Sequence, residues 1–250
     1  MDAPTIAALL LITFLAYFVK GLAGFGPALL VVPFFTLLAG VELALPASAF
    51  FDVLAGSLLF FQIYRRIDWK FCFPLMLAMG SGSFLGAQLV FYLPIEGIRL
   101  TMGVFIFLFA LFLGLKKNQP KTDVTVSAED RFPRRHLYGI GAGFLGGMFG
   151  GLIGMSGPPL IMYMKQVYPK DFFRTQLIVV FMVENAVRLT VYQQNQLFAV
   201  EDSAILLLCL LPLLIGLWLG AQLHLRISET YFNRFIALIL IGVSVKILWF

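Results

Sequence analysis

Two glycine-rich breaks interrupt the apolar sequence and place a cation and a hydroxyl group beside flexible backbone. The first break covers 20–27, KGLAGFGP, and the second covers 151–158, GLIGMSGP. Glycine lets the backbone approach a ligand closely, while ammonium and hydroxyl groups donate hydrogen bonds to it. These residue types together indicate a site for a small anion. The residues predicted to bind it are Lys20, Gly24, Gly26, Gly154, Ser156 and Gly157.

The prolines at the end of each break strengthen this prediction. Pro27 and the pair Pro158 and Pro159 suit the first turn of a helix, where a missing N–H costs nothing. Helices over 27–39 and 157–168 would therefore begin at the breaks. A helix N-terminus presents free N–H groups and about half a positive charge, and both favour a bound anion.

Three further charged residues, Asp52, Glu184 and Arg188, lie within long apolar stretches. A charge inside a bilayer costs at least about 2.5 kcal/mol, so it usually faces a cavity or a partner. Glu184 and Arg188 share one helix face and can form a structural pair. Asp52 and Glu184 occupy comparable segments of two halves of the chain, so both are candidates for carrying a coupling proton. Burial could equally keep either acid protonated and inert.

The composition places the chain in a lipid bilayer. Of its 250 residues, 60% are hydrophobic and 12% are charged, and the mean hydropathy is +0.94. Soluble domains carry roughly 25% charged residues, and a core of this size could not hide so much apolar surface from water. The net charge of +5 by itself does not indicate nucleic acid. Because no metal-ligand spacing or nucleophile–base pair is visible, we expect no cofactor, no metal and no enzymatic activity.

Ten apolar segments predict an all-α polytopic membrane protein. Six of them are long enough to span, since about 20 residues cross a bilayer. These six are 43–64, 69–92, 95–115, 171–193, 203–225 and 229–250. The other four are short and form two pairs, each joined by a break, namely 4–19 with 27–39 and 136–149 with 157–168. Whether 4–19 and 27–39 span fully or re-enter stays open at this point.

The positions of the cations predict how the chain is oriented. Residues 116–135 are polar and contain prolines, which predicts a solvated linker between a first transmembrane repeat, 1–115, and a second, 136–250. Short cytoplasmic loops accumulate Lys and Arg. The basic residues on the predicted cytoplasmic side are Arg65, Arg66, Lys70, Lys116, Lys117, Lys121, Arg131, Arg134, Arg135, Lys165, Lys170, Arg174, Arg226 and Arg234. The linker is therefore predicted to be cytoplasmic and both termini external.

The two halves repeat each other. GLAGFGPALLVVP at Gly21 resembles GLIGMSGPPLIMY at Gly151, and GAQL occurs at both Gly86 and Gly220. Two matches in the same order predict an internal duplication. Each half has an odd number of direction changes, so the second would be inverted relative to the first, an architecture common in secondary transporters. The two breaks would then meet near the midplane, where irregular backbone is tolerated only if it lines a cavity or is buried in protein.

Other interpretations of these residues remain open. Lys20 could extend along the bilayer to an interface if 4–19 crosses fully, and the glycines could serve helix packing alone. Cys72 and Cys209, each followed shortly by a proline, raise the alternative of a thiol–disulfide conduit. In an inverted repeat they should lie too far apart to bond, since a disulfide needs Cα atoms within about 7 Å.

The glycine–proline breaks, the paired GAQL elements, the chain length and the polar loop between the halves resemble the sulfite exporter TauE/SafE family over about residues 5–249. The resemblance implies a bacterial inner-membrane transporter of a small organic or inorganic anion, such as sulfite, sulfoacetate or another sulfonate. Its partners would be the lipid bilayer and the anionic substrate. The direction of transport, the coupling ion and a homodimer stay open. Alternatives from other classes are an anion channel and a non-transporting membrane assembly factor.

Overall fold

The computed structural model describes residues 1–23, 26–115, 132–168, 170–197, 203–222 and 229–249, and within these ranges all regular secondary structure is helical. The helices are α1 (Ala3–Ala23), α2 (Ala28–Ala39), α3 (Val41–Ile63), α4 (Trp69–Leu89), α5 (Ile95–Leu115), α6 (Phe132–Ile153), α7 (Gly157–Val167), α8 (Lys170–Gln194), α9 (Ser203–Gln222) and α10 (Glu229–Trp249), with a short 3-10 helix η1 (Tyr64–Arg66) after α3. The predicted all-α fold is confirmed, and each predicted apolar segment corresponds to one helix.

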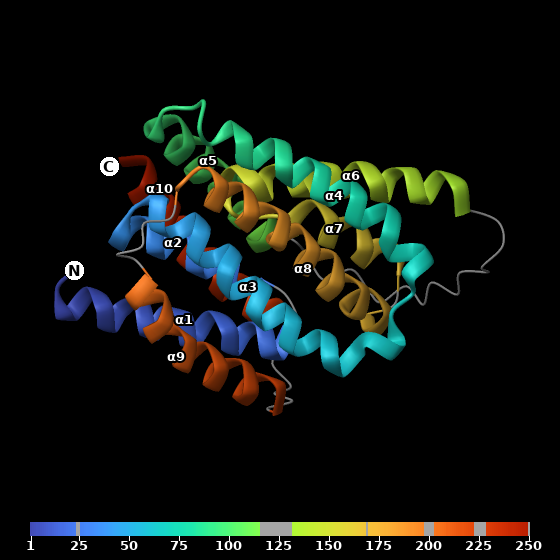
Figure 1. The fold of residues 1–250 in the computed structure, drawn as a ribbon, viewed down its shortest axis with the longest axis horizontal. Helices are drawn as coiled ribbons and strands as arrows, with labels where there is room; N and C mark the ends of the chain where they lie inside the picture. The colour runs from blue at the N-terminus through green and yellow to red at the C-terminus, as the bar shows by residue number, and fades with distance from the viewer. Residues whose placement is uncertain (24–25, 116–131, 169, 198–202, 223–228, 250) are drawn as a thin grey trace.

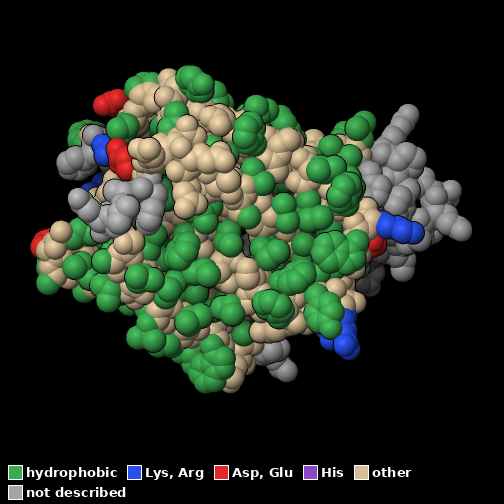
Figure 2. All heavy atoms as spheres, in the orientation of Figure 1, with side chains coloured by type: hydrophobic (Ala, Val, Ile, Leu, Met, Phe, Trp, Pro, Cys, Tyr) green, Lys and Arg blue, Asp and Glu red, His purple; other side chains and the backbone are tan. Residues whose placement is uncertain are grey.

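Among the described residues, six helical stretches are long and apolar enough to cross a membrane. They are Ala3–Leu22, Val41–Arg66, Trp69–Leu89, Ile95–Leu115, Thr175–Gln194 and Ser203–Gln222. Large apolar side chains such as Leu11, Leu108 and Leu211 are exposed on them. Figure 2 shows hydrophobic side chains across the middle of the face in view, with acidic and basic side chains toward its two ends. An apolar band between charged ends is the surface of a polytopic membrane protein.

The first helix of each half is longer than predicted. α1 continues through Lys20 to Ala23, and α6 begins at Phe132, inside the predicted linker, and ends at Ile153. In lipid, every backbone group that leaves a helix without a new partner is costly, so helical hydrogen bonding outweighs the weak helix propensity of glycine. Each break is therefore shorter than predicted. Lys20 lies in the last turn of α1 rather than in the break itself.

Helices from the two halves interleave. α1 lies against α9 and α4 lies against α6, so the first helix of each half packs on the fourth helix of the other (Figure 1). The third helices, α3 and α8, pack on each other, and so do the fifth helices, α5 and α10. Neither half therefore has an interior of its own. The polar side chains of α3 and α8 are enclosed by helices from both halves.

Glycines of the repeated motifs lie at these interleaved contacts. A Cβ added at Gly21 would lie 2.5 Å from Leu217 O and 2.8 Å from the carbonyl carbon of Gly220. A Cβ added at Gly151 would lie 2.8 Å from the carbonyl carbon of Gly86. Positions that match between the halves thus contact each other crosswise, and the missing side chains let the backbones approach. These four glycines serve close helix packing, while the inverted orientation of the second half stays a prediction.

Candidate functional site

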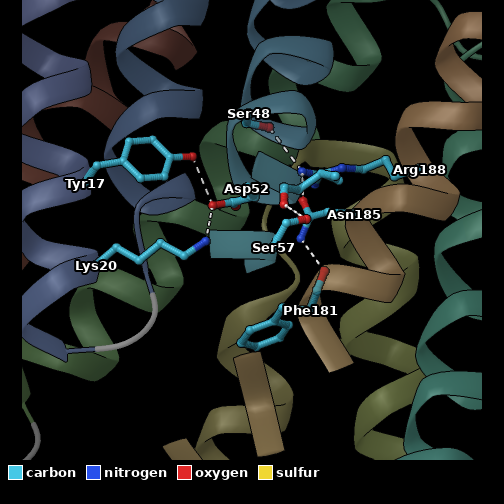
Figure 3. Close-up of polar contacts among 9 residues, drawn as sticks. Tyr17, Lys20, Ser48, Asp52, Ser57, Phe181, Asn185 and Arg188 are labelled. Carbon is cyan, nitrogen blue, oxygen red and sulfur yellow. Dashed lines mark hydrogen bonds and ion pairs between the residues drawn. The ribbon is translucent and has the colours of Figure 1, made fainter. Parts of the chain in front are cut away.

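Lys20 and Asp52 form a buried ion pair between α1 and α3. Lys20 Nζ lies 2.6 Å from Asp52 Oδ1, and the two side chains are 8% and 9% exposed. The Tyr17 hydroxyl donates to the same carboxylate oxygen at 3.0 Å. Tyr17 and Lys20 are one helical turn apart, so both reach Asp52 from one face of α1 (Figure 3). Lys20 therefore points into the protein rather than to a membrane interface.

Arg188 of α8 is fully buried and is held by neutral groups. Its guanidinium donates to the Gly150 carbonyl at 2.8 Å, to Asn185 Oδ1 at 2.6 Å and to Ser48 Oγ at 3.2 Å. Its Nε has no hydrogen-bond partner among the described residues. Within the described part of the chain, no carboxylate lies at ion-pair distance from this guanidinium. Among the described residues, the groups that contact its charge are the neutral dipoles of a carbonyl, an amide and a hydroxyl.

Glu184 is fully buried one turn earlier on α8. Ser83 of α4 donates to its Oε1 at 3.0 Å. A Cβ added at Gly150 would lie 2.5 Å from this same oxygen and 2.6 Å from Ser156 Cβ. The carboxylate therefore adjoins the break of the second half. Its other oxygen, Oε2, has no hydrogen-bond partner in the described ranges.

The direct ion pair predicted between Glu184 and Arg188 is not formed. Both residues are described, and the structure gives no salt bridge between them. A spacing of four residues brings the Cβ atoms of a helix to about 5–6 Å, but each side chain here turns to a neighbouring helix. Glu184 turns to Ser83 on α4, and Arg188 turns to the backbone of α6 and to α3. The Glu184 and Arg188 charges therefore interact electrostatically without direct contact.

α3 connects the two charged clusters. Ser48 and Asp52 are one helical turn apart on α3, and Ser48 accepts from Arg188 while Asp52 accepts from Lys20. Figure 3 shows the α1 side chains and the α8 side chains approaching α3 from opposite sides. Among the described residues, the interior therefore holds two cations and two carboxylates, contributed by α1, α3 and α8, next to the end of α6 at the second break.

The second break is described in full, whereas Gly24 of the first lies outside the described residues. Gly26 and Gly154 have φ angles of 96° and 79°, in the region that favours glycine. A Cβ added at Gly154 would lie 2.8 Å from Val32 Cγ2 and 3.0 Å from Leu45 Cδ2. The second break therefore packs on α2, the short helix that follows the first break, and on α3.

The start of α7 offers an anion a helix dipole but few N–H groups. Ser156 is the N-cap residue, is 7% exposed, and makes no capping hydrogen bond with its side chain. Gly157 is the first residue of the helix, and Pro158 follows it in the first turn. Pro158 and Pro159 lack an N–H, so Gly157 and Leu160 supply the N–H groups of this turn. An anion at this helix start would need further donors from elsewhere.

The sequence analysis missed four polar residues that complete the two clusters. They are Tyr17, Ser48, Ser83 and Asn185. Three of them lie one helical turn from a charged residue that the sequence had singled out, so helical spacing could have found them. Ser83 gives no such signal, because it lies 101 residues from its partner Glu184 and on another helix.

Cys72 and Cys209 are both free and buried. Cys209 belongs to the larger hydrophobic cluster, while Cys72 belongs to a separate cluster that includes residues of α4, α7 and α8. Cys72 Sγ lies 3.1 Å from Gln176 Oε1, a hydrogen bond from α4 to α8. Of the described residues, no three His, Cys, Asp or Glu side chains lie where they could hold a metal ion.

Comparison with known proteins identifies the family of the chain. No curated protein and no solved structure gives a significant match. The sulfite exporter TauE/SafE family matches residues 9–247 of the 250 in the chain. This match confirms the resemblance carried by the two glycine–proline breaks and the paired GAQL elements. The chain therefore belongs to the sulfite exporter TauE/SafE family of membrane transporters.

Proposed function

We propose that the protein is a secondary transporter that moves a small anion, either sulfite, sulfoacetate or another sulfonate, across the bacterial inner membrane. Its family supports anion export as the general class, and the six candidate spans support a multi-pass membrane location. The proposal includes a cytoplasmic linker over 116–135. It also includes proton coupling through the buried acids Asp52 and Glu184.

The observation that carries the proposal is the buried charged region beside the second break. Lys20, Asp52, Glu184 and Arg188 are each less than 10% exposed, and helices with apolar surfaces surround them. Ionisable groups at this depth are costly, and in membrane proteins they mark ion or substrate pathways. A stability role alone would be served as well by apolar residues, because buried ion pairs often stabilise no better than hydrophobic packing.

The interleaved packing supports an inverted repeat around this region. α1 with α9 and α6 with α4 are the same pairing with the halves exchanged. The motif glycines at these contacts, Gly21 with Gly220 and Gly151 with Gly86, are exchanged in the same way. A two-fold axis between the halves would produce this reciprocity, and transporters built so bind their substrates at the repeat interface.

Among the predicted ligand-binding residues, Lys20 attracts an anion less strongly than its full positive charge would suggest. Asp52 contacts its ammonium at 2.6 Å, so an anion near Lys20 must share it with a carboxylate that is always present. Arg188 has no carboxylate in such contact among the described residues. We therefore assign Arg188 as the principal cation for the substrate, with Ser156 and the backbone at Gly154 and Gly157 beside it.

Thermal unfolding of the purified protein in detergent tests this proposal. A ligand that binds only the folded protein stabilises it by about 2.7 kcal/mol at a concentration of 100 times Kd. We expect at least one of sulfite, sulfoacetate, taurine and sulfate to raise Tm. A carboxylate analogue of the best ligand is the compound for comparison. Arg188→Gln should abolish the shift, whereas Arg65→Gln, which changes an exposed arginine of η1, should preserve it.

Transport by the protein in liposomes separates a transporter from a channel. Uptake of the best ligand should saturate with its concentration and should respond to an imposed proton gradient. Flux that rises linearly without saturation would instead favour the channel alternative. If none of the anions binds and none is transported, the proposed function is wrong.

A further inference from the structure

Two polar atoms on consecutive turns of α8 are buried without hydrogen-bond partners among the described residues. One is Oε2 of Glu184, an acceptor, and the other is Nε of Arg188, a donor. Both side chains are 0% exposed. Nearly all buried polar atoms in native proteins are hydrogen-bonded, so an unpartnered acceptor and an unpartnered donor one helical turn apart call for a functional explanation.

The charges around these atoms are arranged unequally. On α1 and α3, Lys20 and Asp52 neutralise each other in direct contact, and Tyr17 adds a hydrogen bond. On α8, Arg188 contacts neutral groups only, within the described residues, and Glu184 accepts from Ser83 and has the Ser156 hydroxyl beside it. Glu184 and Arg188 are thus the members of the cluster that have polar atoms without hydrogen bonds and, among the described residues, no opposite charge in direct contact.

The surroundings of the pair suit an oxyanion. The Glu184 carboxylate adjoins Ser156, the N-cap of α7, because a Cβ added at Gly150 would lie 2.5 Å from Glu184 Oε1 and 2.6 Å from Ser156 Cβ. Arg188 donates to the carbonyl of the same Gly150. The α7 dipole and the guanidinium both favour a negative charge here. The carboxylate opposes it, unless a proton neutralises the carboxylate.

We propose that this site binds an oxyanion together with one proton, as a unit held between Arg188 and Glu184. One ligand oxygen accepts from Arg188 Nε–H, and the proton lies between a second ligand oxygen and Glu184 Oε2. The charge inside the protein then stays constant, because each added negative charge arrives with one proton. This inference rests on the proposed function and specifies how its substrate is held.

Both unpartnered atoms are covered by protein, so the anion reaches them only when the surrounding helices separate. α8 packs on α3 and α4, which belong to the other half, and the break before α7 adjoins the carboxylate. Motion of α8 and the second break relative to α3 and α4, as part of alternating access, would open this contact. The other ionisable groups of the cluster are Lys20, Asp52 and Tyr17 on one side and Tyr192, one turn after Arg188 on α8, on the other.

The test measures protons taken up when an anion binds. Methanesulfonate is the probe, because it has no group that titrates near neutral pH, so any proton must go to the protein. Calorimetric titration of the whole purified protein in two buffers with different ionisation enthalpies gives the proton count. We expect about one proton per anion for the wild type. Glu184→Gln should bind with a count near zero, and Glu96→Gln, which changes an exposed acid of α5, should keep the wild-type count.

Two results of this titration would overturn the inference. They are binding to the wild type without proton uptake, and full uptake retained in Glu184→Gln, which together with uptake lost in Asp52→Asn would assign the proton to Asp52 instead. A second measurement needs no variant: the wild-type Kd for methanesulfonate should rise by about tenfold per pH unit wherever one proton is taken up, because proton uptake makes lower pH favour binding. A Kd independent of pH would also overturn it. Absence of methanesulfonate binding would do the same, while the proposed function falls only if the other anions fail as well.

Discussion

Lys20 Nζ and Asp52 Oδ1 lie 2.6 Å apart, although 32 residues separate them in the chain. The pair joins the end of α1, just before the first break, to the middle of α3. The Tyr17 hydroxyl donates to Asp52, and the Tyr17 ring itself packs edge to face with the Phe51 ring. The pair therefore fixes where the first break begins relative to the central helix of its own half.

The first prediction concerns this pair. Lys20→Met or Asp52→Asn alone should destabilise the protein by about 3–5 kcal/mol, because each leaves a buried charge without its partner. The double variant Lys20→Met with Asp52→Asn should be closer to the wild type than either single variant. Thermal unfolding in detergent measures all four proteins. Strictly additive losses of stability would show that the two side chains do not depend on each other.

The second prediction compares two buried tyrosine hydroxyl groups. Tyr17 donates to the charged Asp52, whereas Tyr192 donates to the neutral carbonyl of Gly151. Hydrogen bonds to charged groups are worth about 1.5–3 kcal/mol and neutral ones about 0.5–1.5 kcal/mol. Tyr17→Phe should therefore lower Tm more than Tyr192→Phe, with the ring packing kept in both. An equal or reversed order would contradict an ionised Asp52.

The third prediction concerns the glycines where helices from the two halves meet. An alanine at Gly86 would place its Cβ against Met148 O and 3.0 Å from Leu152 N, both backbone atoms that cannot rotate away. Gly141, in α6, has nothing within 4 Å of the same position. Gly86→Ala should separate α4 from α6 and lower Tm. Gly141→Ala should be neutral or raise stability by up to about 1 kcal/mol, because alanine favours the helix.

Expression yield and Tm of the two glycine variants, measured side by side, decide this prediction. If Gly86→Ala proves as stable as Gly141→Ala, the close approach of α4 and α6 is not a requirement of the fold.

The fourth prediction tests the inverted orientation. α3 and α8 are the third helices of the two halves, and both Arg65, just after α3, and Gln194, at the end of α8, are exposed. In an inverted repeat these two helix ends lie on opposite sides of the membrane. A cysteine at Arg65 should react with an impermeant reagent only from the cytoplasm, and one at Gln194 only from outside. The wild-type protein is the control, because Cys72 and Cys209 are buried.

Labelling of both positions from the same side would remove the inverted repeat and the two-fold arrangement around the site. Membership of the family and the buried charges would stand regardless of that result.

The sequence by itself determined the environment and the elements of this protein. An apolar content of 60% requires lipid, and lipid requires that backbone groups bond within helices. The lengths of the apolar segments and the glycines and prolines between them then located the ten α-helices of the described residues. Pro27 and Pro158 can begin a helix more easily than continue one. The TauE/SafE resemblance was also visible, since the motifs that carry it are local in the chain.

The positions where the helices end at the two breaks depended on a competition between helix propensity and helix packing, and the packing cannot be read from the sequence. The breaks were predicted to begin at Lys20 and Gly151, yet Lys20, Gly21 and Gly151 all lie inside helices. The neighbours of the two glycines on α9 and α4 explain why, because a glycine that packs against another backbone is held in the helix by that contact. Helix propensity alone pointed the other way.

Only the tertiary structure decided the partners of the charges. Spacing along one helix predicted Glu184 with Arg188, but the folded chain offers Glu184 a serine on α4 and offers Arg188 a carbonyl on α6. Asp52 had no partner within its own segment, and in the structure it pairs on α3 with Lys20 of α1. The physical reason is that a buried polar group takes the best hydrogen bonds within reach in space. That reach is set by how helices pack, which spacing along the chain does not encode.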